Sequence, residues 1–215
     1  MISLKNYFLT QNKMFWLLPL AILILTFYIH YVIIMGYEID FFRNANSQTR
    51  EEILNGEIAI YKINFFMNLL VYISQVVFVT IGLNIGLLFF EYEKSLQEIG
   101  SLVIKSSIAL ILIYLISPLL LLYSDEALSF EKLYNIESDF TLSRFIEKDS
   151  PIWLKNVLEM FSFSQLIFVL TLSLGFKYLM GWTYNKSLIW VLKIYGILFI
   201  LWVGFAIIMD LNFYQ

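Results

Sequence analysis

Two long apolar runs near the carboxyl end of the chain constrain its fold most strongly. Residues 157–182 and 187–209 are joined only by a polar turn at residues 183–186. Each run exceeds the roughly 20 residues that a helix needs to cross a hydrocarbon core about 30 Å thick. Lipid offers the backbone no hydrogen-bond partners, so both runs must be helical. The sequence therefore predicts an antiparallel transmembrane hairpin that closes the chain.

Three further apolar runs precede this hairpin. They cover residues 14–35, 61–90 and 102–123. A polar loop at residues 36–60, with a short helix expected at residues 47–55, follows the first run, and a second polar loop at residues 124–155 follows the third. Of the 215 residues, 60% are hydrophobic and only 14% are charged, too few charges to cover a folded chain in water. We expect an all-α polytopic membrane protein: one domain over residues 1–215, built as a bundle of five transmembrane helices.

Basic residues are concentrated in the short segments on one side of this arrangement. Seven basic and three acidic residues would lie on the side of the amino terminus, and seven basic and fourteen acidic residues on the other. Basic residues in short connections favour the cytoplasmic side. The sequence therefore predicts a cytoplasmic amino terminus. Residues 1–13 carry apolar side chains at helical spacing, and we expect them to lie on the membrane before the first span.

Aromatic and basic residues surround the tip of the closing hairpin. Tryptophan and tyrosine rings favour the headgroup layer, and lysine amines can reach it by snorkelling. The tip is therefore predicted to lie at a membrane surface and to form a candidate interface. Its members are Lys177, Trp182, Tyr184, Lys186, Trp190 and Lys193.

Four amide side chains interrupt the apolar runs: Asn68, Gln75, Asn84 and Gln165. Inside a bilayer each amide needs a hydrogen-bond partner away from lipid. The four can line a path for a solute, or they can join helices, with each such bond contributing about 0.6 kcal/mol on average. We favour helix joining, because no acidic residue lies in the middle of a span to couple ion movement.

Small residues recur four positions apart on two of the predicted spans. Gly82 and Gly86 form a G-x-x-x-G motif on the second span, and Thr171 and Gly175 form a similar face on the fourth. Small residues at this spacing let another helix approach closely. We favour packing within the bundle over a dimer interface.

Neither a catalytic nor a metal-binding motif accompanies these features. His30 is the only histidine and has no second type of ligand arranged around it, whereas a metal site needs several convergent donors. The chain has no cysteine, which excludes thiolate chemistry and disulfides. No phosphate-binding loop and no aromatic–basic patch outside the membrane is present. We expect a protein without catalytic activity, metal, cofactor or nucleic-acid partner.

The order of the segments and two local motifs suggest one family. Leu174-Gly175-Phe176-Lys177-Tyr178, followed by Gly181-Trp182-Thr183-Tyr184-Asn185-Lys186-Ser187-Leu188, leads through the turn into the last span. Lys94-Ser95-Leu96 with Lys105-Ser106-Ser107 opens the third span. This arrangement resembles the Yip family of five-span membrane proteins, including its bacterial branch. One departure is Ile108, which follows Ser107 where that family often has a proline.

The resemblance implies a role without catalysis in a bacterial inner membrane. Eukaryotic members act as partners of Rab GTPases and membrane-shaping proteins, and some bacterial members are implicated as accessory factors of ABC exporters. It therefore implies an accessory, assembly or scaffold partner of another membrane complex, for example an ABC-type exporter. Two other classes stay open: a transporter or permease subunit with a polar path, and an immunity-type membrane protein. Amides that converge on water would favour transport, and a dry bundle would favour the partner role.

Overall fold

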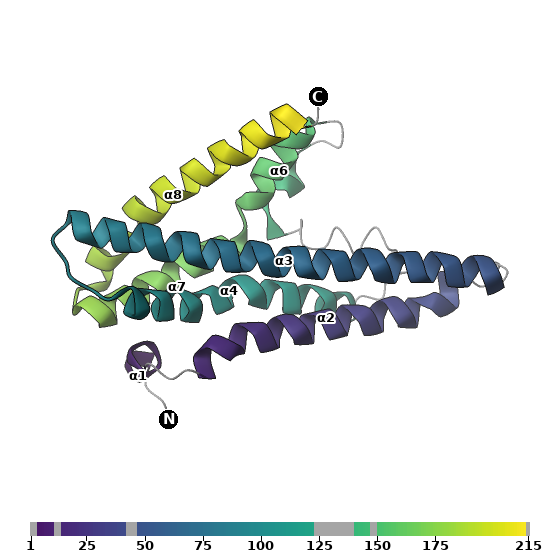
Figure 1. Ribbon diagram of the computed structural model, residues 1–215, viewed down its shortest axis with the longest axis horizontal. Helices are drawn as coiled ribbons and strands as arrows, with labels where there is room; N and C mark the ends of the chain where they lie inside the picture. The colour runs from purple at the N-terminus through teal and green to yellow at the C-terminus, as the bar shows by residue number, and fades with distance from the viewer. Residues whose placement is uncertain (1–3, 11–13, 42–46, 123–139, 147–149, 214–215) are drawn as a thin grey trace.

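The computed structural model describes residues 4–10, 14–41, 47–122, 140–146 and 150–213 (Figure 1). Within these ranges the chain forms seven α-helices and one short 3-10 helix, with one isolated β-bridge and no strand. The helices are α1 Leu4–Leu9, α2 Met14–Phe41, α3 Ser47–Phe89, α4 Leu96–Leu122, η2 Leu142–Phe145, α6 Ile152–Met160, α7 Phe163–Met180 and α8 Tyr184–Phe213. The all-α fold expected from the sequence is confirmed for the described residues.

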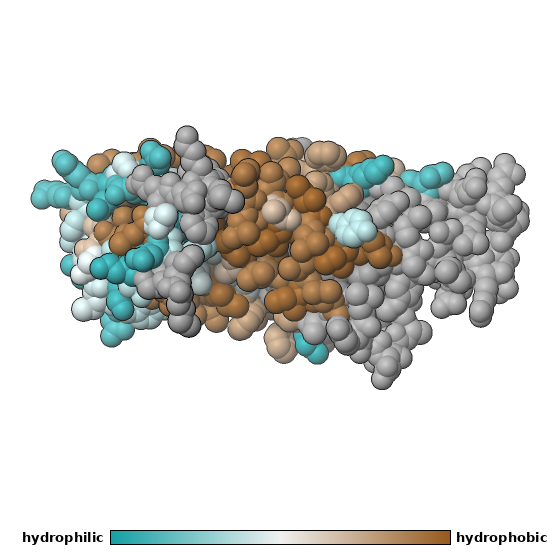
Figure 2. All heavy atoms as spheres, turned by 90° about the horizontal axis from the view of Figure 1, so that it is seen from below, coloured by the Kyte–Doolittle hydropathy of each residue, from teal (hydrophilic) through white to brown (hydrophobic). Residues whose placement is uncertain are grey.

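Three of these helices are long and apolar enough to cross a membrane. The candidate spans are Phe65–Phe89 within α3, Phe163–Met180, which is the whole of α7, and Tyr184–Met209 within α8. Many of their large apolar side chains are exposed on the outside of the bundle, among them Leu88, Phe89 and Ile200. In Figure 2 these side chains form a hydrophobic surface in the middle of the molecule, next to a hydrophilic end. This surface is the one that a membrane protein presents to lipid.

The helix α4 lies at the centre of the bundle. Residues 99–107 of α4 are all buried, and α4 packs against α2, α3 and α7. The core cluster that contains side chains of α4 also includes Leu83 and Leu87 of α3, Leu172 and Phe176 of α7 and Val191 of α8. The chain therefore surrounds one helix with the others rather than arranging all of them in an equal ring.

The structure differs from the predicted loop at residues 36–60. Residues 36–41 continue α2 and residues 47–60 begin α3, so the predicted loop is wrong for most of its length. The short helix expected at residues 47–55 is the first part of this much longer helix. Residues 47–60 contain no proline and a single glycine, so nothing in them stops a helix. Polarity excludes this stretch from the hydrocarbon, but it does not exclude a helix that continues into water.

As a consequence, α3 is one helix of 43 residues. At 1.5 Å per residue it is about 65 Å long, roughly twice the thickness of a hydrocarbon core. Figure 1 shows α2 and α3 side by side at the end of the molecule farthest from α1, and the two helices are in contact. The candidate span Phe65–Phe89 is therefore continuous with residues 47–64 of the same helix, which we call the polar extension.

The structure also divides the predicted fourth span, residues 157–182. Its first turn belongs to α6, the helix stops at Phe161, and α7 begins after Ser162. The Ser162 hydroxyl accepts a hydrogen bond from the Gln165 backbone N–H at 3.2 Å, which caps the new helix. Thr141 pairs with Ser162 in an isolated antiparallel bridge. The span therefore shortens to the 18 residues of α7, which reach about 27 Å.

The remaining predicted spans lie within helices of similar or greater length. Residues 14–35 fall inside α2 and residues 187–209 fall inside α8, while α3 covers residues 61–89 and α4 covers residues 102–122 of the other two predicted spans. A connection of only three residues joins α7 to α8, and these two helices pack against each other.

The two glycines of the G-x-x-x-G motif face α8. A Cβ atom at Gly82 would overlap the side chain of Leu198, and one at Gly86 would lie 3.0 Å from three atoms of Ile194. The missing side chains therefore make room for branched side chains of α8, so this motif packs side chains and not two backbones against each other.

Replacing Gly82 by leucine should destabilise the bundle, because the new side chain would have to displace Leu198. Overpacking of this kind typically costs about 1–3 kcal/mol. The matched control is Gly204→Leu on α8, where a Cβ atom meets nothing within 4 Å. Thermal unfolding in mild detergent should show a lower midpoint for Gly82→Leu and little change for Gly204→Leu. Equal midpoints for the two variants would contradict the contact.

Candidate functional site at one end of the bundle

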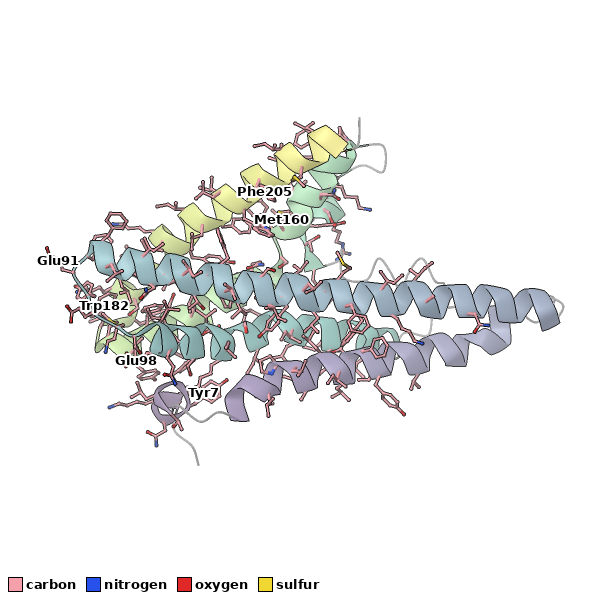
Figure 3. The ribbon with its side chains drawn as sticks, viewed as in Figure 1. Tyr7, Glu91, Glu98, Met160, Trp182 and Phe205 are labelled. Carbon is pink, nitrogen blue, oxygen red and sulfur yellow. The ribbon has the colours of Figure 1, made fainter. Side chains whose placement is uncertain are left out.

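One end of the bundle brings together segments that are far apart in the sequence. Figure 3 places Tyr7 of α1, Glu91 after α3, Glu98 of α4 and Trp182 of the α7–α8 turn at this end. Figure 2 shows hydrophilic residues gathered here beside the hydrophobic middle. We call it the lysine end, defined by Lys5, Lys94, Lys177, Lys186 and Lys193.

A chain of aromatic rings attaches the α7–α8 turn to the bundle. The ring centroids of Tyr92 and Trp182 lie 5.1 Å apart, those of Trp182 and Trp190 lie 5.9 Å apart, and both pairs meet edge to face. Trp190 is only 8% exposed, and its ring centroid lies 4.8 Å from that of Phe176 in the core. Edge-to-face ring pairs stabilise a fold beyond what the burial of their apolar surface contributes. The turn is therefore held in a defined position and not only tethered by its two helices.

Two lysines of the predicted interface lie on aromatic faces. The Lys186 ammonium lies 4.7 Å from the centre of the Trp182 ring, and the Lys177 ammonium lies 5.4 Å from that of Tyr178. Contacts of this kind are favourable cation–π interactions. The structure thus joins Trp182, Lys186 and Trp190 in one cluster. Among the described contacts, Tyr184 and Lys193 do not enter it.

The first turn of α4 is closed by a capping box. The Ser95 backbone N–H donates to the Glu98 carboxylate at 3.0 Å, and the Glu98 backbone N–H donates to the Ser95 hydroxyl at 3.2 Å. The hydrogen bond from the Ser95 backbone is the main cause that lowers the pKa of Glu98. The spacing S-x-x-E in the sequence is the signal that would have found this start of α4.

A buried lysine holds α1 against the bundle. Lys105 of α4 is only 3% exposed, and its ammonium donates to the carbonyl oxygens of Phe8 at 3.0 Å and Thr10 at 2.5 Å. In return, the Tyr7 hydroxyl donates to the Lys105 carbonyl oxygen at 3.3 Å. The last carbonyls of a helix have no partner within it and attract positive charge. Lys105 therefore acts as a cap supplied by another helix.

The side chain of Phe8 enters a notch that a glycine opens. Its ring stacks on Tyr178 with the centroids 6.1 Å apart. A Cβ atom at Gly175 would lie 3.0 Å from the Phe8 ring and would overlap Leu102. One turn earlier, the Thr171 hydroxyl lies 3.4 Å from the Ser106 carbonyl oxygen of α4. The small face of α7 is therefore packed within the chain, against α4 and α1.

The four predicted amides do not converge. The Tyr195 hydroxyl of α8 donates to the Gln165 side chain of α7 at 2.5 Å, and the Gln75 side chain of α3 lies beside the same hydroxyl. These two amides therefore meet at the junction of three helices. Asn68 is exposed on the outside of α3, and Asn84 is half-buried closer to the lysine end.

Neither a metal cluster nor a known relative identifies the function of this end. In the part of the chain that the structure describes, no group of three or more His, Asp or Glu residues could hold a metal ion. Comparison with protein-family models, curated proteins and solved structures finds no match to this chain. The contacts described above are therefore the observations on which a function can be argued.

Replacing Lys105 by methionine should release α1, because the Phe8 and Thr10 carbonyls lose a charged donor. Hydrogen bonds to charged groups contribute about 1.5–3 kcal/mol, so the amide protons of α1 should exchange roughly 10- to 100-fold faster. Hydrogen exchange read by mass spectrometry measures this rate. Lys94→Met, at a half-buried lysine of the same end, is the control. Unchanged exchange in Lys105→Met would mean that the Phe8 contact alone holds α1.

The Gln165–Tyr195 bond should appear as a coupling energy between two substitutions. We expect Gln165→Leu and Tyr195→Phe to be non-additive in unfolding free energy by about 0.6 kcal/mol, with an upper bound near 1.7 kcal/mol. Gln165→Leu combined with Tyr178→Phe, a tyrosine at the far end of the same helix, should be additive. Additivity in both pairs would show that this bond does not join α7 to α8.

Proposed function

We propose that this protein is a five-span integral membrane protein that acts without catalysis, as an accessory, assembly or scaffold partner of another membrane complex. The resemblance to the Yip family supports this role, and an ABC-type exporter is the class of complex that the resemblance suggests. The charge distribution supports an amino terminus in the cytoplasm, and the resemblance to the bacterial branch of the family suggests a bacterial inner membrane.

The lengths of α2 and α4 support five spans. Besides the three candidate spans, α2 has 28 residues and α4 has 27, and both exceed the roughly 20 residues needed to cross a bilayer. The two helices pack extensively against each other. Since α4 is surrounded by α2, α3 and α7, it shares their environment. Together with α3, α7 and α8 they account for the five apolar runs of the sequence.

One observation carries the choice of a scaffold over a transporter: the meeting of Gln75 and Gln165 on the Tyr195 hydroxyl. A transport path requires polar groups that face a solute. Here two half-buried amides lie at the Tyr195 hydroxyl between α3, α7 and α8 instead of facing a path. The Tyr72 hydroxyl, 2.7 Å from that of Ser107, joins α3 to α4 in the same way. Polar groups used between helices give a bundle a fixed shape, which suits a protein that other proteins bind.

The polar extension of α3 is the surface that we assign to the protein partner. Of its 43 residues, the 18 before the candidate span at Phe65 reach about 27 Å past the apolar part. The extension, residues 47–64, contains three acidic and two basic residues. A polar helix that projects from the bilayer is accessible to a partner protein, and its small acidic excess favours a partner with a basic surface.

Site-specific photo-cross-linking tests this role. A photoreactive amino acid at Asn55 or Ile60, both exposed on the extension, should form in cells a discrete adduct with another integral membrane protein. The same amino acid at Leu88, 60% exposed within the candidate span, should form no such adduct because it faces lipid. The opposite result has two parts: no adduct forms at Asn55 or Ile60, and the purified protein alone moves a solute across the membrane of proteoliposomes. That result would show a transporter and not a scaffold.

A further inference from the structure

We propose that the lysine end binds the headgroups of anionic phospholipids, with Lys177, Lys186 and Lys193 as the cations that contact the lipid phosphates. This site lies at the opposite end of α3 from the extension assigned to the protein partner. The inference rests on the membrane spans and the contacts of this end, and it does not depend on the proposed partner role.

The ends of three candidate spans place this site at the level of the headgroups. The spans of α3, α7 and α8 reach Phe89, Met180 and Tyr184 here. The window in α8 has 26 residues, about two turns more than a hydrocarbon core requires. An excess of this size allows the first turns of α8 to extend into the headgroup layer, which would place Lys186 inside it and Lys193 close enough to reach it by snorkelling.

One face of α8 is charged at one end and apolar along the rest, as a phospholipid molecule is. Lys186, Ile189, Lys193, Ile197 and Ile200 follow one another at spacings of three and four residues, so they form one stripe along the helix. All five are exposed. The lysines lie at the end of this stripe nearest the membrane surface, and isoleucines continue it toward the middle of the bilayer. A lipid with its phosphate at the lysines would lay its acyl chains along Ile197 and Ile200.

The cations of this end are available to a ligand. In the described parts of the chain, Lys177, Lys186 and Lys193 form no ion pair. Of the three carboxylates that share this end, Glu98 already accepts hydrogen bonds from Ser95. Glu91 and Glu93 are exposed, and they leave the lysines in excess. The net positive charge is complementary to an anionic leaflet.

The protein also positions these cations before any lipid arrives. The Trp182 ring lies beneath Lys186 and is fixed by edge contacts with Tyr92 and Trp190. On the neighbouring helix, Lys177 lies over Tyr178, whose ring stacks on Phe8 of α1. Ammonium groups that are already oriented lose less entropy on binding than free side chains do.

The helix α1 extends the same surface. Figure 1 views α1 nearly along its axis while the long helices run across the picture, so α1 lies across the end of the bundle. Leu4 and Leu9 are 60% and 42% exposed, and Lys5 is exposed between them. An interfacial helix places such leucines among the acyl chains and its lysine among the headgroups. The Lys105 cap keeps α1 in this position.

The test compares lipid preference in two variants of equal charge. Lys177→Gln, Lys186→Gln and Lys193→Gln are combined in one variant; the control combines Lys62→Gln, Arg144→Gln and Lys155→Gln, which replaces three exposed cations outside the lysine end. Each protein is purified and titrated in nanodiscs with phosphatidylglycerol against phosphatidylcholine, and the retained lipids are counted by native mass spectrometry. Nanodiscs expose both leaflets, so the result does not depend on the orientation of insertion.

We expect wild type and the control to retain phosphatidylglycerol preferentially, and the first variant to lose this preference. At about fivefold in affinity for each lysine near an anionic surface, the loss should approach 100-fold. A third variant with arginine at positions 177, 186 and 193 should keep the preference, which separates loss of charge from loss of folding. Retained preference in the glutamine variant, or equal loss in the variant and its control, would overturn the proposal.

Discussion

The fold depends on one constraint: the polar groups of a helix that is buried within an apolar bundle can find partners only inside the protein. Residues 99–107 of α4 are all buried, yet they include Lys105, Ser106 and Ser107. The Lys105 ammonium donates to α1, the Ser107 hydroxyl pairs with Tyr72 of α3, and the Ser106 carbonyl lies against the Thr171 hydroxyl of α7. Three successive residues therefore connect α4 with three other helices. Because lipid offers no alternative partners, each connection favours one position of the neighbouring helix over all others along α4.

The Lys105 contact shows how such a constraint selects a structure. A charged group in an apolar interior is strongly unfavourable unless it is hydrogen-bonded. The best acceptors for an ammonium group are carbonyl oxygens that lack a partner of their own, which occur at the carboxyl end of a helix. The short helix α1 supplies two such oxygens, and its Phe8 ring fills the notch at Gly175. A helix of six residues is marginal by itself. It is stable here because α4 and α7 complete it.

The sequence predicts the features of this fold that depend on length and hydropathy, and it misses those that depend on distant contacts. Apolar runs of sufficient length predict the helices of the closing pair, and the glycine spacing predicts close packing at Gly82 and Gly86. Hydropathy cannot distinguish a loop from a helix in water, which is why residues 36–60 are mistaken for a loop. The break at Phe161 depends on a bridge to Thr141, twenty-one residues before Ser162 in the chain. The hydrogen bond from Lys105 to Phe8 joins residues separated by 97 positions, and no local pattern encodes it.

The continuous helix α3 relates the two ends to which we assign different ligands. Near the lysine end, Gly82 and Gly86 pack on α8, the helix that carries Lys186 and Lys193. At the other end the same helix continues as the polar extension without a break. A straight α-helix is stiff over this length, because each residue is linked to the fourth one along by a backbone hydrogen bond. Headgroups that hold the lysine end at one leaflet would therefore also set how far the extension projects past the opposite leaflet. Lipid binding at one surface would in this way determine where a partner meets the protein at the other.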